Sequence, residues 1–268
     1  MPEGPEVKIA SDYFNVFFSN SKWMKFEIIS EYYHKKYFNT FKIINQNLII
    51  PKSTYTVGKN IFLNLEDNLI ANLHLGMTGG WSNTAQKHCH FRVFSANKEL
   101  FYKDVRKFGK IKIISLSEFE NKFNIFFDLL HNSYNIEKHL LFLDKKINDK
   151  KSICSILMNQ LYFPGVGNYI KSESLYETKL HPEEKWKKLN QTTKINLIKN
   201  TQNIMKRSYK HGGAELKDFK NPFSKSIFEL KVYGKKTTPS NTPIINQLTS
   251  DSRKTWFCSK TQKLNMNN

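Results

Sequence analysis

The chain has 268 residues and a formal net charge of +19, because 42 lysines and arginines stand against 23 aspartates and glutamates. Aromatic residues make up 14% of it, which is ample material for a packed core and excludes a wholly disordered protein. A surplus of positive charge favours a polyanionic partner, and nucleic acid is favoured over an anionic membrane. The many lysine, asparagine and isoleucine residues also point to codon bias, so charge alone is a weak argument for DNA.

Signals for export or membrane insertion are not found in the sequence. No apolar run approaches the length that spans a bilayer, and the first thirty residues lack the basic and apolar regions of a signal peptide. The cysteines, Cys89, Cys154 and Cys258, are too few and too far apart for a disulfide framework or a CxxC zinc site. We therefore expect an intracellular protein, in the nucleus or cytoplasm, that is neither secreted nor membrane-bound.

The first residues, Pro-Glu-Gly-Pro-Glu at 2–6, allow two interpretations. Pro5 suits the first position of a helix, and Glu6 suits the positive end of the helix dipole, so a turn leads into a helix over 5–19. Alternatively, Pro2 becomes a reactive terminal amine once Met1 is removed. The stretch alone does not decide between the two.

Short β-rich segments separated by turn residues follow this helix and predict a mostly antiparallel sandwich or barrel. These segments are 25–30, 41–45, 47–51, 59–66, 68–76, 90–95, 99–104 and 109–115. Residues 1–116 are therefore expected to form one domain, in which a single helix packs on β-structure.

From Ser117 onwards the apolar spacing becomes helical. The segments with this spacing are 115–132, 149–161, 166–180 and 191–213, the last ending at Gly212 and Gly213. Residues 117–228 are expected to form a helical domain. The tail, 227–262, alternates again and predicts a small hairpin, so that 229–268 forms a third region.

Three glycine-rich or turn-forming stretches carry candidate functional residues. Residues 163–176 place two glycines before a helix that Asn168 can cap, which suits either a phosphate site or an ordinary helix connection. Met77 follows a strand in a glycine-rich turn, and residues 103–111 are expected to place Arg106 and Phe108 on one side of an extended segment. Such side chains can fill the space left by a flipped base, although Met and Phe are more often core residues.

The sequence Lys-His-Cys-His at 87–90 suggests a metal site at first sight. His88 and His90 would share one face of a strand, with Cys89 on the other. No further ligand lies at zinc-like spacing, so no metal is expected, and His88 is interpreted as a contact for a DNA phosphate or sugar.

Taken in order, these motifs resemble those of the formamidopyrimidine-DNA glycosylase and endonuclease VIII family of base-excision repair enzymes. The motifs that carry the resemblance are PEGPEV at 2–7, Lys59, HLGMTG at 74–79, KHCH at 87–90, DVRKFG at 104–109, LMNQ followed by GVGNYIKSESLY at 157–176, HGGAELKDF at 211–219, ELKVYGKK at 229–236 and SRKTWFC at 252–258. The resemblance implies an α+β fold, with an N-terminal helix, an antiparallel β-sandwich, a helical domain with a helix-two-turn-helix element, and a hairpin finger. It also implies a monomeric DNA glycosylase and apurinic/apyrimidinic lyase that acts on double-stranded or single-stranded damaged DNA without a cofactor.

The resemblance assigns a role to each matching residue. Pro2 would be the nucleophile, and chemistry supports this because a terminal amine has a pKa of about 8, against about 10.4 for lysine. Glu3 would act as general acid and base with Glu6 supporting it, and Lys59 would bind the phosphate near the lesion. The remaining assignments are Met77, Arg106 and Phe108 as void-filling residues, Asn168 and Lys150 (with Lys151) as contacts to the DNA backbone, and Arg253 as the finger residue that grips phosphate.

The C-terminal region departs from the pattern of many family members, which carry a four-cysteine zinc finger. Here Cys258 remains and Thr261 replaces its partner, so we predict a zincless finger held by packing of Trp256 and Phe257, as in an endonuclease VIII-like branch of animals and some viruses. The compact segment 220–229 favours oxidised pyrimidines and ring-opened purines as substrates. An enzyme for oxidised guanine, and a non-catalytic damaged-DNA-binding protein, stay as alternatives.

Overall fold

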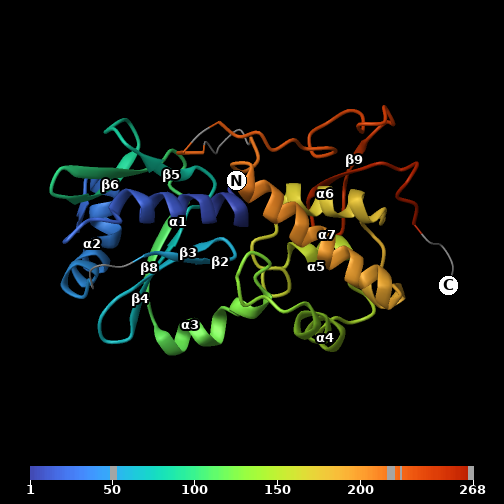
Figure 1. The fold of residues 1–268 in the computed structure, drawn as a ribbon, viewed down its shortest axis with the longest axis horizontal. Helices are drawn as coiled ribbons and strands as arrows, with labels where there is room; N and C mark the ends of the chain where they lie inside the picture. The colour runs from blue at the N-terminus through green and yellow to red at the C-terminus, as the bar shows by residue number, and fades with distance from the viewer. Residues whose placement is uncertain (49–52, 216–220, 224, 265–268) are drawn as a thin grey trace. The chain divides into compact units, whose positions relative to one another are not determined.

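The structure is a computed structural model that describes residues 1–48, 53–215, 221–223 and 225–264. The chain forms two compact units, each built from two segments (Figure 1). The first unit comprises Met1–Phe123 with Glu215–Ile227, and the second comprises Asn124–Ala214 with Phe228–Asn268.

The first unit is a sandwich of two four-stranded antiparallel sheets, with strand orders β1-β6-β7-β5 and β2-β3-β4-β8. Its core cluster contains side chains from both sheets and from two helices, which confirms the predicted β-sandwich. The elements are α1 (Gly4–Phe18), β1 (Lys25–Ile28), α2 (Glu31–Gln46), β2 (Tyr55–Val57), β3 (Asn60–Asn64), β4 (Leu69–His74), β5 (Gly79–Ser82), β6 (Cys89–Ser95), β7 (Lys98–Asp104), β8 (Lys110–Ser115) and α3 (Leu116–Lys122).

Helix α1 forms where the sequence predicts it. Pro5 occupies the first turn, and the carboxylate of Glu6 accepts a hydrogen bond from the backbone N–H of Glu3 at 2.8 Å, which completes a capping box. The apolar face of the helix is buried in the core, where the indole N–H of Trp81 donates to the carbonyl of Ala10 at 3.0 Å. The start of α1, and with it Pro2, is therefore fixed against the sandwich.

The segment 41–45, which we expected to be a strand, lies instead within α2. Ser30 caps this helix by accepting a hydrogen bond from Tyr33 N at 3.3 Å, and Tyr37, Phe41 and Ile44 lie buried on one face. A short apolar run fits either a strand or a helix. Here Tyr37, Phe41 and Ile44 recur at intervals of three and four residues, which is the spacing of one helix face. The sandwich therefore carries a second helix. Most of the expected strand at 47–51 lies outside the described residues, and Leu48 forms an isolated bridge with Leu65.

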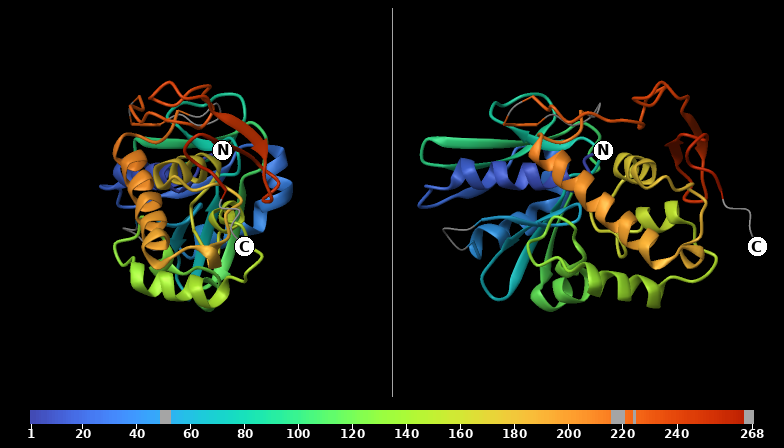
Figure 2. Two further views of the ribbon diagram at one scale, coloured as in Figure 1. Left: turned by 90° about the vertical axis from the view of Figure 1, so that its right-hand side faces the viewer. Right: turned by 45° about the vertical axis from the view of Figure 1, so that its right-hand side comes forward.

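The second unit is mainly helical and ends in a hairpin (Figure 2). Its elements are η1 (Ile125–Phe127), α4 (Ile136–Lys146), α5 (Ile153–Met158), α6 (Asn168–Thr178), η2 (Trp186–Lys188), α7 (Gln191–Lys210), β9 (Ile245–Leu248) and β10 (Lys254–Phe257). Helix α7 stops just before Gly212 and Gly213, both with positive φ, as the sequence predicts. No helix within the described ranges is long and apolar enough to cross a membrane.

The continuous helix expected over 115–132 is interrupted. Helix α3 ends at Lys122, and the chain then turns into η1, where the side chain of Asn124 accepts a hydrogen bond from Phe126 N at 2.9 Å. An asparagine side chain competes in this way with continued helical hydrogen bonding. As a result, α3 belongs to the first unit and η1 to the second.

The C-terminal hairpin is a finger without the four cysteines of a zinc site, as predicted. Strands β9 and β10 pair antiparallel, and hydrogen bonds close the turns where zinc ligands would be needed. In the first turn Thr238 N donates to the carbonyl of Thr242 at 2.8 Å, and in the second Cys258 N donates to the side-chain oxygen of Gln262 at 2.8 Å. The ring of Trp256 packs against Tyr233 with centroids 4.5 Å apart. Backbone pairing, turn hydrogen bonds and aromatic packing together hold the hairpin.

The second unit contains a buried imidazole that makes its stability depend on pH. His139 is fully buried, and burial lowers its pKa from 6.5 to about 4, although a hydrogen bond to the carbonyl of Tyr162 opposes the shift. Because the folded-state pKa lies below the unfolded one, the unfolded chain takes up the proton first. The stability that neutral His139 contributes is therefore present above pH 6.5 and is lost as the pH falls toward 4.

We expect acidification from pH 6.5 to 4 to cost about 3 kcal/mol of unfolding free energy through His139 alone. Urea unfolding of wild type and His139→Phe, measured across this range, isolates the contribution as a difference between the two curves. The variant should show the weaker pH dependence; parallel curves would contradict the assignment.

Candidate active site and DNA-binding surface

A cavity of about 660 Å³ opens in the first unit beside the N-terminus and is large enough for a nucleotide-sized ligand. Its polar wall comes from two paired strands, because Asn72 and His74 share one face of β4, and Lys112 and Lys110 face them on β8. The lining residues are Met1, Lys36, Asn60, Asn72, His74, Gly76, Met77, Lys107, Phe108, Gly109, Lys110, Lys112, Ile114, Glu118, Lys122 and Phe123. Five of the lining residues are lysines and one is a glutamate, so the net charge of the lining favours an anion.

The predicted nucleophile and acid lie next to this cavity. Met1 lines it, and Pro2 and Glu3 follow directly as buried residues at the start of α1. The side chain of Glu3 accepts a hydrogen bond from the backbone of Glu6, whose own carboxylate holds Glu3 N, so the two carboxylates are fixed by one capping box. Both are at least nine-tenths buried. The sequence therefore positions Pro2 and Glu3 through local helix capping.

Lys59 forms the tip of the hairpin between β2 and β3. Val57 pairs with Asn60, and Gly58, with φ of 61°, takes the first position of the two-residue turn, where a type II′ turn requires glycine. The side chain of Lys59 is buried, with 8% of its surface exposed. A lysine that served only to solvate the end of the hairpin would be exposed, so solvation alone does not explain its position.

His74 is a further candidate, which the sequence analysis did not single out. Burial, together with the charges of Lys59 and Lys110, lowers its pKa below 6.5, so the ring is neutral at pH 7. Its Nδ1 accepts a hydrogen bond from Gly76 N at 3.0 Å, which assigns the proton to Nε2. A neutral ring that donates from Nε2 can bind a phosphate oxygen. Its position at the end of a strand, as the first residue of HLGMTG at 74–79, was the available signal.

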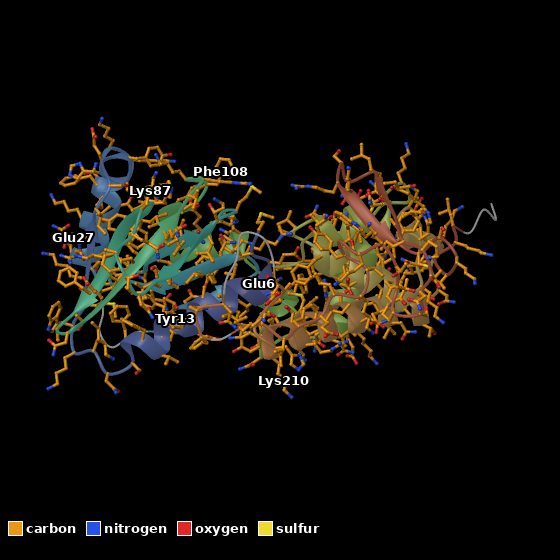
Figure 3. All side chains as sticks on the ribbon, turned by 90° about the horizontal axis from the view of Figure 1, so that it is seen from above. Glu6, Tyr13, Glu27, Lys87, Phe108 and Lys210 are labelled. Atoms are coloured by element: carbon orange, nitrogen blue, oxygen red, sulfur yellow. The ribbon has the colours of Figure 1, made fainter. Side chains whose placement is uncertain are left out.

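The three void-filling candidates come together at one edge of the first unit. Met77 lies in the loop between β4 and β5, and Arg106 and Phe108 lie in the loop between β7 and β8. A guanidinium nitrogen of Arg106 is 3.3 Å from the sulfur of Met77. Phe108 is 54% exposed and projects from the loop (Figure 3). An exposed phenylalanine beside a cavity is available for contact with a base.

The segment around Arg106 and Phe108 is a turn and not the extended segment that we predicted. Val105 and Arg106 form a turn, and Lys107 has φ of 58°, in the left-handed region. Alternation along a strand therefore does not apply here, and the two side chains share an edge because the chain reverses between β7 and β8.

The side chain of Asp104 bonds to both the β4–β5 loop and the β7–β8 loop. The sequence analysis did not identify this residue. Its buried carboxylate accepts hydrogen bonds from the hydroxyl of Thr78 and from Gly109 N, the latter at 2.7 Å. The hydroxyl oxygen of Thr78 in turn accepts from Arg106 N at 3.0 Å. One carboxylate thus fixes both loops, and with them Met77, Arg106 and Phe108.

The Lys-His-Cys-His stretch does not form the alternating strand that we expected. His88 lies in a turn with φ of 71°, and the register shifts between Cys89 and Phe91. His90 is buried between Ser30 Oγ, at 2.9 Å, and the carbonyl of Asp104, at 2.8 Å, which gives it a structural role. Across the described part of the chain, no three His, Cys, Asp or Glu side chains gather as a metal site would require.

In the second unit, Asn168 is not the helix cap that we predicted. Gly167 takes the N-cap position of α6, and Asn168 is the first helical residue. Its side-chain N–H group donates to the carbonyl of Lys254 in β10 at 2.9 Å. Because Gly167 takes the cap position, the side chain of Asn168 is available to bind the finger.

The two basic candidates of the second unit are both exposed. Lys150 lies in a turn before α5, and its backbone carbonyl accepts a hydrogen bond from the ammonium group of Lys185 at 3.1 Å. Arg253 lies in the turn between β9 and β10. Both side chains are accessible to a phosphate.

Comparison with known proteins identifies the family of this chain. Models of the formamidopyrimidine-DNA glycosylase N-terminal domain and H2TH domain match residues 1–111 and 130–220. These matches define a DNA glycosylase of base-excision repair. A formamidopyrimidine-DNA glycosylase of Rickettsia bellii (strain OSU 85-389) is 31% identical over 83% of this chain and 84% of the relative. The chain therefore belongs to the formamidopyrimidine-DNA glycosylase family, whose members are DNA glycosylases with apurinic/apyrimidinic lyase activity.

Solved structures share the fold over nearly the whole chain. A point mutant of Lactococcus lactis FPG in complex with Fapy-dG-containing DNA has a TM-score of 0.81, with 24% identity over 98% of this chain and 100% of that one. The wild-type L. lactis FPG in complex with oxidised-pyrimidine-containing DNA has a TM-score of 0.79 at the same identity and coverage. The predicted family fold is thereby confirmed.

The close contact at Gly76 gives a direct test of the loop arrangement. Gly76 has φ of 69°, and a Cβ there would lie 2.6 Å from the carbonyl carbon of Phe108. We expect Gly76→Ala to destabilise the protein by about 1–3 kcal/mol and to weaken binding to abasic-site DNA by displacing Phe108. Thermal unfolding and fluorescence anisotropy measure the two effects.

Gly80→Ala is the matched control, because a Cβ at Gly80 meets nothing within 4 Å. It should leave stability within about 0.5 kcal/mol and leave DNA affinity unchanged. Equal behaviour of the two variants would contradict the role assigned to the close approach at Gly76.

Proposed function

We propose that this protein removes oxidised bases from DNA and then cleaves the strand, with Pro2 as the nucleophile once Met1 is removed. The observation that carries the proposal is the position of Pro2 and Glu3 at the capped start of α1, immediately after Met1, which lines the lysine-rich cavity. Lys59 precedes Asn60, which pairs with His74, so both lie at the same end of strands β3 and β4, and the void-filling loops line the same cavity. Lys59 and His74 can bind a phosphate, and the loops can fill the space left by a flipped base.

The reaction begins with a new bond between the Pro2 nitrogen and C1′ of the damaged nucleotide. The N-glycosidic bond breaks, and the base leaves with the electron pair and takes up a proton. Glu3 protonates the ring oxygen O4′, the sugar opens, and the secondary amine becomes an iminium cation. No oxidant or reductant is needed, because each step moves only a proton and an electron pair.

Strand cleavage follows from the iminium, which acts as an electron sink. Loss of the C2′ proton sends an electron pair toward the iminium nitrogen, and the C3′–O bond then breaks to release the 3′ phosphate. Loss of the C4′ proton releases the 5′ phosphate in the same way, and water frees Pro2. Lys59 and neutral His74 bind a phosphate of the lesion strand, and Arg253 stabilises the second departing phosphate.

DNA binding in this proposal uses both units. Arg106, Phe108 and Met77 fill the space of the extruded base, which offsets part of the few kcal/mol that unstacking costs. Asn168, Lys150 and His88 contact the DNA backbone, in keeping with the charge of +19. The substrate is damaged DNA, double-stranded or single-stranded, and the protein acts as an intracellular monomer without a cofactor.

Among oxidised bases, we propose oxidised pyrimidines as the main substrates, with ring-opened purines as a second class. The compact segment 220–229 supports the first class, although residues 220 and 224 lie outside the described residues. The names of the curated relatives, formamidopyrimidine-DNA glycosylases, favour the second. The L. lactis enzyme has been solved with DNA that contains either kind of lesion.

Borohydride trapping tests the nucleophile. Protein with Pro2 at its terminus should form a covalent adduct with an oligonucleotide that contains one thymine glycol, because reduction converts the iminium to a stable amine. Pro2→Gly, and protein that retains Met1, should trap at less than about a hundredth of this level, since neither presents the proline amine. Gel electrophoresis and intact-mass analysis give the readout.

Pro5→Ala is the control, because Pro5 also lies in the first turn but follows the capping residue. It should trap within about twofold of wild type. Normal trapping by protein with Met1 retained would refute Pro2 as the nucleophile and leave a DNA-binding scaffold.

A panel of lesions tests the substrate class. We expect single-turnover excision of thymine glycol and dihydrouracil to be at least as fast as that of a formamidopyrimidine, and roughly tenfold faster than that of oxidised guanine, a difference that one favourable pocket contact can supply. Identical duplexes that differ in the one lesion provide the comparison. Faster excision of oxidised guanine would assign the protein to the oxidised-purine class.

A further inference from the structure

The finger of this protein needs an external support. A two-stranded hairpin alone is marginally stable, and this one, with four residues in each strand, lacks the cysteines for zinc. Strand β9 is exposed along its whole length, so the support has to come from the side of β10. Figure 2 shows β10 (red) beside α6 (yellow), and the two elements are in contact.

Helix α6 supplies that support through polar side chains. Asn168 donates to the carbonyl of Lys254 at 2.9 Å, and Ser172 Oγ accepts from Trp256 N at 3.4 Å. These two contacts lie one helical turn apart on α6 and two residues apart on β10, so they follow one edge of the strand. They hold the strand. The turn that carries Arg253 is closed by two hydrogen bonds from Thr249 to the carbonyl of Arg253, at 3.0 and 2.9 Å, and its attachment to α6 needs a further contact.

The turn is fixed by a buried ion pair. The ammonium group of Lys171 lies 2.6 Å from Oδ2 of Asp251, and the two side chains are 0% and 3% exposed. The other carboxylate oxygen of Asp251 accepts from the hydroxyl of Thr249 at 2.6 Å and from Arg253 N at 3.3 Å. Asp251 therefore joins α6 directly to the backbone of Arg253.

We propose that Lys171 and Asp251 are positioning residues for Arg253, and that they set the efficiency of the second elimination. This inference rests on the proposed function. A buried ion pair contributes little net stability, because desolvation of the two charges offsets their attraction, but it fixes geometry. Arg253 is itself exposed, so the orientation of its guanidinium group depends on how firmly its backbone is held. A small displacement of a charged group at a reacting phosphate costs a large factor in rate.

The first elimination and the trapping step need Pro2, Glu3 and Lys59, all of which lie in the first unit. Lys171, Asp251 and Arg253 lie in the second. Loss of the ion pair should therefore change the ratio of the two elimination products more than the amount of adduct. That ratio distinguishes positioning from a general loss of stability.

The experiment compares Asp251→Asn with wild type on an oligonucleotide that carries one abasic site. We expect the ratio of δ- to β-elimination product to fall at least fivefold, with borohydride trapping retained within twofold. Asp144→Asn is the matched control, because Asp144 lies in the same unit and binds Lys194 and Trp186, each at 2.8 Å, which are outside the finger. It should leave the product ratio unchanged, even where thermal stability falls.

A double variant, Lys171→Met with Asp251→Leu, separates folding from positioning. Replacing both charges by apolar side chains restores packing without an unpaired charge, so the melting temperature should return to that of wild type. The ratio should stay at least fivefold low, because the link to Arg253 N is missing. Recovery of the ratio together with the melting temperature would overturn the proposal.

Thr249→Val is a milder variant that keeps the ion pair and removes the hydroxyl that bonds to Asp251, to the carbonyl of Arg253 and to Thr255. It should lower the ratio about twofold to threefold. A wild-type ratio in both Thr249→Val and Asp251→Asn, with normal trapping, would refute the positioning role alone. Absence of trapping in the wild-type protein would refute the proposed function instead.

Discussion

The second unit depends on the polar side chains that α6 buries. Lys171, Ser172 and Glu173 are nearly inaccessible to solvent, in a helix whose burial would normally call for apolar residues. Buried polar groups are costly without partners, and the finger supplies them. The carboxylate of Glu173 alone accepts hydrogen bonds from the N–H groups of Lys231, Val232 and Tyr233, at 2.8–3.0 Å. The folded position of the finger is therefore dictated by its hydrogen bonds to α6.

In the first unit, a buried side chain likewise holds the loops beside the cavity. Asp104 is fully buried at the end of β7, and its carboxylate holds the two loops that present Met77, Arg106 and Phe108. In both units, a buried carboxylate lies next to a strand and fixes the backbone of an exposed candidate side chain, Asp104 that of Arg106 through Thr78 and Asp251 that of Arg253. Loops that carry function can remain exposed because their anchors are not.

The lysines in the cavity beside the N-terminus affect both the binding of an anion and the protonation of neighbouring groups. The lysines that line it attract an anion, and a positive surrounding also disfavours the protonated form of an amine or an imidazole. His74 shows this effect directly, since Lys59 and Lys110 add to burial in lowering its pKa. One set of positive charges thus affects both anion binding and the protonation of His74.

The sequence by itself determined the capped start of α1, most strands of the sandwich, the stop of α7 and the finger without zinc, because caps, alternation and missing cysteines are local. Its motifs also identified the family, while the roles of Pro2, Glu3, Lys59 and Arg253 remain predictions. Only the tertiary structure decided that 41–45 is helical, that His74 is neutral, and that Asp104 and Asp251 anchor functional loops. The partners of these two carboxylates include Thr78, 26 residues from Asp104, and Lys171, 80 residues from Asp251. Long-range packing alone determines which polar groups are buried, and burial gives them their roles.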